Sequence, residues 1–199
     1  MKVLIACEYS GIVRDELCKK NINAYSCDIL PSDSELTNQK KKHIQDDLMN
    51  ILHLNWDVII AFPPCTDLSN AQAGKIMNEK IANGKAVKAL EFIKKIYNSS
   101  NKICIENPVS SYLNKNWIPY SQIIEPYFFG HNYRKKTCLW LKNLPPLIST
   151  LYCYPKYVKV YTGKKNTQPL YKNINKKNQA KFRSEFHTGV AQAIANQWF

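Results

Sequence analysis

Long apolar runs are missing from this chain of 199 residues. No stretch approaches the roughly 20 residues that a membrane-spanning helix needs, and Met1 leads only into "KVLIA", which is too short and wrongly flanked for a secretory signal. Hydrophobic residues still make up 45% of the composition, enough to build a packed core. We therefore expect a single domain over residues 1–199 in the cytoplasm, with no membrane partner.

A metal-binding cysteine pattern is also missing. The seven cysteines form no C-x-x-C pair and have no histidine at zinc-finger spacing, so we expect no metal site. Most are expected to be small buried residues in a reducing compartment. A cysteine that is assigned a chemical role therefore needs an argument of its own.

Acidic side chains and arginines are scarce. The chain has 15 Asp and Glu against 28 Lys and Arg, and its arginines are Arg14, Arg134 and Arg183, giving a net charge of +13. Such an excess suits a polyanion such as DNA, although codon drift in an A/T-rich genome would also enrich lysine. Nine basic and no acidic residues lie between Lys156 and Arg183, interleaved with aromatic ones. We predict that residues 155–182 form a basic loop or insert that contacts a nucleic-acid backbone.

Short apolar stretches alternate with segments of helical spacing. The pattern predicts strands at 2–6, 23–29, 56–62 and 102–106, and helices at 11–20, 46–54, 78–97 and 183–199. The strand "WDVIIAF" lacks polar alternation after Asp57, which is typical of a parallel strand covered on both faces. "QIIEPYFFG" and "TCLWL" predict antiparallel edge strands near the C-terminus. The fold class is therefore α/β, an open and mostly parallel sheet with helices on both faces.

Two details of the helices follow from the same pattern. Asp46 is the predicted cap of the helix at 46–54. The helix at 78–97 is expected to turn one apolar side to the core, made of Ile81, Val87, Leu90, Ile93 and Ile96.

The residues that follow the strands are the first to inspect, because ligands of open α/β sheets bind beyond the carboxyl ends of the strands. The first strand is followed by Glu8, Tyr9, Ser10 and Gly11, the second ends at Asp28 and Ile29, and Asp47 follows the third segment. Gly11 would let the backbone approach a ligand. Asp28 could accept hydrogen bonds from both ribose hydroxyls, and Asp47 could accept one from an adenine amine. These positions predict a nucleoside site, against the alternative of solvated strand ends.

The stretch "IIAFPPCTDL" (59–68) ends a buried strand at two prolines and a cysteine. Cys65 could be a small core residue, which is the more frequent role of a cysteine. Pro63 and Pro64, however, have no N–H and a fixed φ, so they end the ladder and hold Cys65 in a rigid turn. Glu106 follows the next buried strand and is braced by Asn107-Pro108 in the same way. A nucleophilic thiol beside a carboxyl group is a recognisable catalytic pair.

These residues resemble the DNA cytosine-5 methyltransferase family. The family's Pro-Cys nucleophile motif matches Pro64-Cys65, and its Glu-Asn motif matches Glu106-Asn107. Its Gly-Asp-Ile turn resembles Asp46-Asp47-Leu48, and its terminal helix resembles "HTGVAQAIANQW". In "HNYRKKTCLWL", Arg134 is the best counterpart of the family's base-contacting arginine, with Lys136 in reserve.

The chain departs from the family in two places. The family's Phe-x-Gly-x-Gly cofactor turn is replaced by "ACEYSG", in which only Gly11 fits. Members usually carry a large target-recognition region before the last motif, where this chain has a short segment. Similar short proteins occur in phage and prophage settings, which implies the cytoplasm of a bacterial or phage-infected cell. A protein partner that supplies sequence recognition would fit this arrangement.

The resemblance implies a Rossmann-like fold and methyl transfer from S-adenosylmethionine to carbon 5 of cytosine in DNA. In the family's chemistry, Cys65 would add to carbon 6 of the base, Glu106 would hold ring nitrogen 3 and the exocyclic amine, and Arg134 would hold the carbonyl oxygen. The DNA cytosine would have to be flipped or unpaired. The implied cofactor contacts are Glu8, Tyr9, Ser10, Gly11, Asp28, Ile29, Asp47 and Pro63.

Three other functions fit parts of the pattern. The missing glycines of the cofactor turn suit a nucleic-acid-binding relative with weak or no catalysis. The small size suits a methyltransferase for RNA or a free nucleotide. Amino methylation, whose motif also has two prolines, needs a hydrogen-bond acceptor before them, which Phe62 cannot provide.

Overall fold

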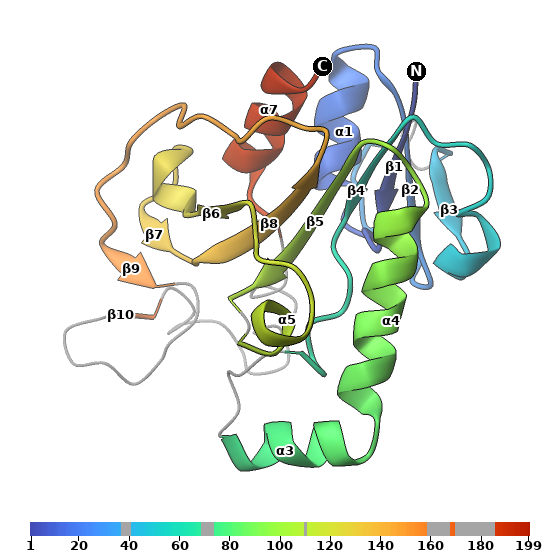
Figure 1. The fold of residues 1–199 in the computed structure, drawn as a ribbon. Helices are drawn as coiled ribbons and strands as arrows, with labels where there is room; N and C mark the ends of the chain where they lie inside the picture. Colours follow the sequence, from blue (N-terminus) through green and yellow to red (C-terminus); the bar gives the residue numbers. More distant parts are fainter. Residues whose placement is uncertain (37–40, 69–73, 110, 159–167, 170–185) are drawn as a thin grey trace.

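A seven-stranded sheet forms the centre of the molecule, with the strand order β3-β2-β1-β4-β5-β8-β6 (Figure 1). The structure is a computed structural model and describes residues 1–36, 41–68, 74–109, 111–158, 168–169 and 186–199. The strands of this sheet are β1 (Lys2–Ala6), β2 (Asn23–Asp28), β3 (His43–Gln45), β4 (Val58–Ala61), β5 (Ile103–Pro108), β6 (Gln122–Ile124) and β8 (Thr137–Lys142).

The five strands from β3 to β5 are parallel to their neighbours, with β1 at the centre. The fully buried runs of β1 and β4 fit this place, because a central parallel strand is covered on both faces. β8 is antiparallel to β5, and β6 is antiparallel to β8. The predicted sheet, mostly parallel with antiparallel strands toward the C-terminus, is confirmed.

Helices cover both faces of the sheet. Figure 1 shows α1 (Ile12–Lys19) and α7 (Thr188–Gln197) behind it and α4 (Lys85–Asn98) in front, with the short α5 (Ser111–Asn116). Val3 and Ile5 of β1 pack into the layer of α1 and α7, whereas Leu4 and Ala6 pack toward α4. Each fully buried aliphatic side chain stabilises the fold by about 1.5–3 kcal/mol, so both layers hold the sheet.

Two predicted helices are wrong in detail. The segment at 46–54 contains only a short 3₁₀ helix, η1 (Leu48–Asn50), and its cap is Asp47, whose side chain accepts a hydrogen bond from the Met49 N–H. The stretch at 78–97 is two helices, α3 (Gly74–Ala82) and α4, because Gly84 has a left-handed backbone (φ 75°) between them. The break leaves Ile81 and Val87 exposed. Leu90, Ile93 and Ile96 are buried as expected.

The strand β5 is longer than predicted. It continues through Asn107 and Pro108, since the antiparallel partner β8 pairs with it over its whole length. The parallel ladder with β4 ends three residues earlier, at Ile105. Glu106 therefore lies inside a strand, at the point where one of its two neighbouring strands has ended.

The C-terminal part adds a small second sheet with the order β10-β9-β7, made of β7 (Tyr133–Arg134), β9 (Tyr157–Val158) and β10 (Gln168–Pro169). It is preceded by the short helix η2 (Pro126–Phe128). The rest of the predicted basic segment at 155–182 lies outside the described residues. The predicted helix at 183–199 begins at Thr188 in the structure, and residues 183–185 also lie outside the described part.

Candidate active site

A cavity of about 640 Å³ opens at the carboxyl ends of β1, β2, β4 and β5. Its volume is in the range of small-molecule and cofactor sites. It brings together nine of the eleven predicted site residues, from the ends of five separate strands: Glu8, Tyr9, Ser10, Asp28, Ile29, Asp47, Pro63, Cys65 and Glu106. Gly11 and Arg134 do not line it. Cys7, Leu30, Phe92, Lys135 and Phe186, which the sequence did not single out, do.

Two carboxylates stand on one side of the cavity. Asp28 Oδ1 accepts a hydrogen bond from the Leu30 N–H at 2.9 Å, and Asp47 Oδ1 accepts one from the Met49 N–H, also at 2.9 Å. These local bonds fix the direction of both side chains. Each carboxylate keeps its Oδ2 for a ligand, because no described residue donates a hydrogen bond to it. Ile29 and Leu30 add exposed apolar surface beside them.

The Glu8 carboxylate is turned to the start of α1. Its two oxygens accept hydrogen bonds from the Val13 N–H at 2.7 Å and the Arg14 N–H at 3.3 Å. These donors are free N–H groups of the helix N-terminus. Burial raises the pKa of Glu8 to about 7, although both hydrogen bonds act in the opposite direction. Its side chain supports the turn after β1, and its predicted contact with a cofactor stays a prediction.

The structure shows a packing role for Gly11, and its predicted approach to a ligand stays a prediction. Its backbone is left-handed (φ 75°), and a Cβ at this position would come within 2.3 Å of Arg14 Nη2 and 3.0 Å of Ser34 Cβ. The space beside Gly11 is thus filled by the protein itself. Glycine is needed there for the turn and for the packing of Arg14.

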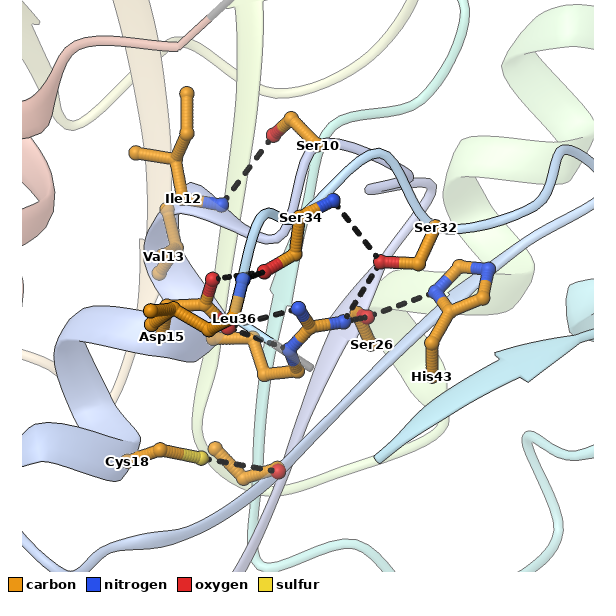
Figure 2. A network of polar contacts seen from close by, with 12 residues as sticks. Ser10, Ile12, Val13, Asp15, Cys18, Ser26, Ser32, Ser34, Leu36 and His43 are labelled. Atoms are coloured by element: carbon orange, nitrogen blue, oxygen red, sulfur yellow. Dashed lines mark hydrogen bonds and ion pairs between the residues drawn. The ribbon is translucent and has the colours of Figure 1, made fainter. Parts of the chain in front are cut away.

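A buried polar network around Arg14 holds the segment that follows β2 (Figure 2). The Arg14 guanidinium forms an ion pair with Asp15 at 2.7 Å and donates to the Ser26 hydroxyl at 2.7 Å. Ser34 donates to the other oxygen of Asp15 at 2.6 Å. Because the Arg14 side chain is fully buried, each bond satisfies a group that would be costly to leave unpaired. The network ties α1 to the chain after Asp28.

His43 continues this network to the rim of the cavity. Its Nε2 lies 2.9 Å from the Leu30 carbonyl oxygen, and its Nδ1 lies 2.9 Å from the Ser26 hydroxyl. A carbonyl only accepts, so Nε2 carries a proton, and in a neutral ring Nδ1 accepts from Ser26. Leu30 is thereby held from both sides, since its N–H donates to Asp28.

Cys65 stands at the other side of the cavity, in a turn fixed from two directions. The Phe62 N–H donates to the Ala6 carbonyl at 2.9 Å, and the Asn107 side-chain amide donates to the Pro63 carbonyl at 3.1 Å. Asn107 is fully buried and its Oδ1 has no hydrogen-bond partner in the described part of the chain. An unpaired buried oxygen costs about 1–3 kcal/mol. The hydrogen bond from Asn107 on β5 to the proline turn is therefore accompanied by an unpaired oxygen that lowers the stability of the fold.

The environment of Cys65 disfavours its thiolate in the free protein. Burial raises the pKa of the Cys65 thiol, and the nearby Glu106 carboxylate raises it further, whereas Lys135 and Lys80 act to lower it. Neutralising Glu106 by a proton would remove the repulsion and make the thiolate more accessible.

Glu106 has a hydroxyl partner that the sequence did not predict. Thr137 on β8 lies within hydrogen-bonding distance of Glu106 Oε1 and 3.0 Å from the Asn107 carbonyl oxygen. A hydroxyl has one proton, so when it donates to the Asn107 carbonyl it can accept from a protonated Glu106. The site therefore accommodates both charge states of this carboxyl group.

The basic residue at the cavity is Lys135, and the sequence singled out its two neighbours. Side chains alternate in extended chain, and Lys135 and Thr137 are more buried than the exposed Arg134 and Lys136. Arg134 instead lies with its guanidinium carbon 5.7 Å from the centre of the Tyr127 ring. Arg134 and Lys136 do not line the cavity, and their predicted roles stay predictions.

The described part of the chain shows neither a group of three or more metal-ligating side chains nor a helix long and apolar enough to cross a membrane.

Comparison with known proteins gives a fold and no family. No protein-family model matches the sequence, and no curated protein matches it. Among solved structures, the Entamoeba histolytica methyltransferase EhMeth superposes with a TM-score of 0.50 at 21% identity, over 76% of this chain and 56% of that one. A mutant of Spodoptera frugiperda DNMT2 gives a TM-score of 0.41 at 14% identity, over 84% of this chain and 57% of that one.

The fold is thus the Rossmann-like fold of methyltransferases, as predicted from the sequence. The chain spans little more than half the length of both solved structures. The phage-type assignment stays a prediction, because neither source organism bears on it.

Proposed function

We propose that the protein transfers a methyl group from S-adenosylmethionine to carbon 5 of cytosine in a nucleic acid, through a covalent adduct of Cys65. One observation carries the proposal: a thiol and a carboxyl group line the same cavity as two carboxylates that stand at nucleoside-binding positions of the sheet. The fold of methyltransferases supports it.

The residues on the carboxylate side fit the cofactor. Asp28 has an oxygen free for ribose hydroxyls and Asp47 has one for an adenine amine, while Ile29 and Phe92 offer apolar surface to the adenine ring. When bound, S-adenosylmethionine supplies an electrophilic methyl group on a sulfonium. The turn after β1 would lie along the cofactor with its backbone, since the Glu8 side chain is engaged with α1.

The residues on the thiol side fit the base. Carbon 5 of cytosine is a poor nucleophile, and addition of the Cys65 sulfur to carbon 6 makes it an enamine that can attack the methyl group. A protonated Glu106 would donate to ring nitrogen 3, which makes the addition favourable and removes the negative charge that raises the pKa of the thiol. Lys135 would take the role expected of Arg134 and donate to the carbonyl oxygen of the base.

The test is covalent trapping on a strand that carries 5-fluorocytosine. In the ordinary reaction carbon 5 loses its proton after it has taken the methyl group, and the Cys65 sulfur then leaves carbon 6. Fluorine cannot leave as a proton does, so with S-adenosylmethionine present the Cys65 adduct should persist and be visible as a shifted band and a mass increase. Cys65→Ser should abolish trapping and lower methylation by orders of magnitude, because a hydroxyl is almost wholly protonated near neutral pH. Cys104→Ser is the matched control, since Cys104 is buried within β5 and does not line the cavity.

A second candidate is a methyltransferase-like nucleic-acid-binding protein with little turnover. The raised pKa of Cys65 favours it, because less of the nucleophile is available in the free protein. Nucleic-acid binding without trapping, at any pH up to 9, would leave this candidate ahead.

A further inference from the structure

An array of aromatic rings lies on the surface formed by η2 and the chain after β8. The rings of Tyr127, Phe128 and Tyr152 contact one another, with centroids 4.3, 5.8 and 6.0 Å apart. Tyr152 is 59% exposed and Phe128 is 38% exposed. The Cys153 N–H donates to the Tyr127 carbonyl at 2.7 Å, so the backbone holds the rings together. Aromatic faces this open are available for stacking.

One cation lies beside these rings, and a second follows Tyr152 closely in the chain. The Arg134 guanidinium carbon is 5.7 Å from the centre of the Tyr127 ring, and the Lys156 N–H donates to the Asn132 carbonyl at 2.9 Å, which places Lys156 next to β7. Both side chains are exposed. We call this surface, made of Tyr127, Phe128, Arg134, Tyr152 and Lys156, the aromatic–basic surface. The nearby acid Glu125 is engaged, since its carboxylate accepts a hydrogen bond from the Lys135 N–H at 3.0 Å.

The charge of the chain is concentrated around this surface in the sequence. Residues 126–184 contain 13 Lys and Arg and no Asp or Glu. The remaining residues hold 15 basic and 15 acidic side chains, so the whole net charge of +13 comes from this one stretch. Codon drift would add lysine throughout the chain and would not clear acidic residues from a single stretch of it. The concentration therefore points to a polyanionic partner.

We propose that the aromatic–basic surface binds an unpaired nucleic-acid strand, with bases stacked on the rings and phosphates held by Arg134 and Lys156. A polyanion without bases would need the cations only, and a duplex hides the faces of its bases. Arg134 lies on this surface while its neighbour Lys135 lines the cavity, so a bound strand can continue toward the cavity. The inference deepens the proposed function and rests on it only for what happens to the strand after binding.

Fluorescence anisotropy on the full chain, without any methyl donor, tests the surface. The probes are a single-stranded thymidine oligonucleotide, an abasic strand of the same length, a duplex, and a uridine strand that separates DNA from RNA as the source. Stacking on one ring contributes roughly 1–3 kcal/mol per base, so Tyr152→Leu should weaken the thymidine strand about tenfold. The same variant should leave the abasic strand unchanged, and Tyr152→Trp should keep binding.

Matched variants separate this surface from general effects. Tyr120→Leu removes an exposed ring outside it, which packs against Trp140, and should change nothing. Arg134→Gln with Lys156→Gln should lower the salt slope by about 1.4, at roughly 0.7 per phosphate contact on a single strand. Lys88→Gln with Lys94→Gln removes the same charge from the exposed face of α4 and should leave the slope as it is.

Equal binding of the thymidine and abasic strands, tighter binding of the duplex, or unchanged binding in Tyr152→Leu would each overturn the proposal. Circular dichroism melting checks that the variants fold. Tyr152→Leu should fold normally, because Tyr152 is exposed. If a strand binds here but is never methylated, the proposed reaction is overturned and the proposed binding surface stands. If the protein methylates a strand and Tyr152→Leu leaves the KM unchanged, the proposed reaction stands and the surface is not where the strand binds.

Discussion

Lys135 lines the cavity although the sequence pattern pointed to its neighbours Arg134 and Lys136. It lines the cavity and lowers the pKa of the Cys65 thiol, in opposition to burial and to Glu106. Arg134 and Lys136, on either side, are exposed. The reactivity of Cys65 should therefore depend on one of three consecutive cations.

Lys135→Gln should make Cys65 less reactive. Removing this cation takes away one of the two lysines that oppose burial and Glu106, so the thiol pKa rises and less thiolate exists at a given pH. Alkylation by iodoacetamide, followed on the Cys65 peptide by mass spectrometry, should move to higher pH. Lys136→Gln carries the same charge change and should behave like the unmodified protein. Identical profiles for both variants would remove Lys135 from the site.

Glu8 gives a prediction about stability and pH. Its pKa is raised from 4.5 to about 7 in the folded protein, so the folded state binds a proton more tightly than the unfolded state. The stability that the protonated Glu8 adds to the folded state is fully present below about pH 4.5 and is lost as the pH rises through 7. The free energy of unfolding changes by an amount on the order of 3 kcal/mol. Urea unfolding at pH 5 and pH 8 should show this decline, and Glu8→Gln should reduce it. An equal decline in Glu8→Gln would assign it to other groups.

At the scale of elements, the two glycine caps form a natural pair. Gly11 precedes α1 and Gly84 precedes α4, both with φ of 75°. A Cβ on Gly84 meets nothing within 4 Å, whereas one on Gly11 meets the buried Arg14 at 2.3 Å. The same substitution therefore separates backbone strain from a steric clash.

Gly84→Ala should cost about 1–2 kcal/mol, the usual cost of a left-handed backbone for a residue with a Cβ. Gly11→Ala should cost clearly more, because the Arg14 network must also move. The free energy of unfolding, measured with urea for both variants, compares them. Equal losses would mean that Arg14 moves aside freely.

The strands and the convergence of their ends were accessible from sequence because they follow from local features. "KVLIA" is an unbroken apolar run, and the β1 of the structure has the same bounds. The break at Gly84 and the antiparallel extension of β5 depend on packing partners distant in sequence, which periodicity does not contain. The register that turns Lys135 to the cavity is of the same kind, since it is set by the pairing of the neighbouring Thr137 with Pro108 across the sheet.

For the whole molecule, ligand binding should be visible as thermal stabilisation. S-adenosylhomocysteine, the demethylated product, at 100 times its dissociation constant would add about 2.7 kcal/mol, which raises Tm by about 5–11 °C for a chain of this size. Asp28→Asn keeps the hydrogen bond to the Leu30 N–H but removes the charge, and should reduce the shift. The same Tm shift in Asp28→Asn and the unmodified protein would place the ligand elsewhere.

Both chain ends lie at the top of the view in Figure 1, on the side of the sheet where β1 begins, whereas the cavity opens at the carboxyl ends of the strands. The amino group of Met1 is 3.9 Å from Asp57, just before β4, and Lys20 at the end of α1 donates to the Ala195 carbonyl in α7. A linker attached to either end would leave the carboxyl edge of the sheet uncovered. The molecule could therefore be tethered to a bead or a sensor chip by either terminus, with the opening of its cavity directed into solution.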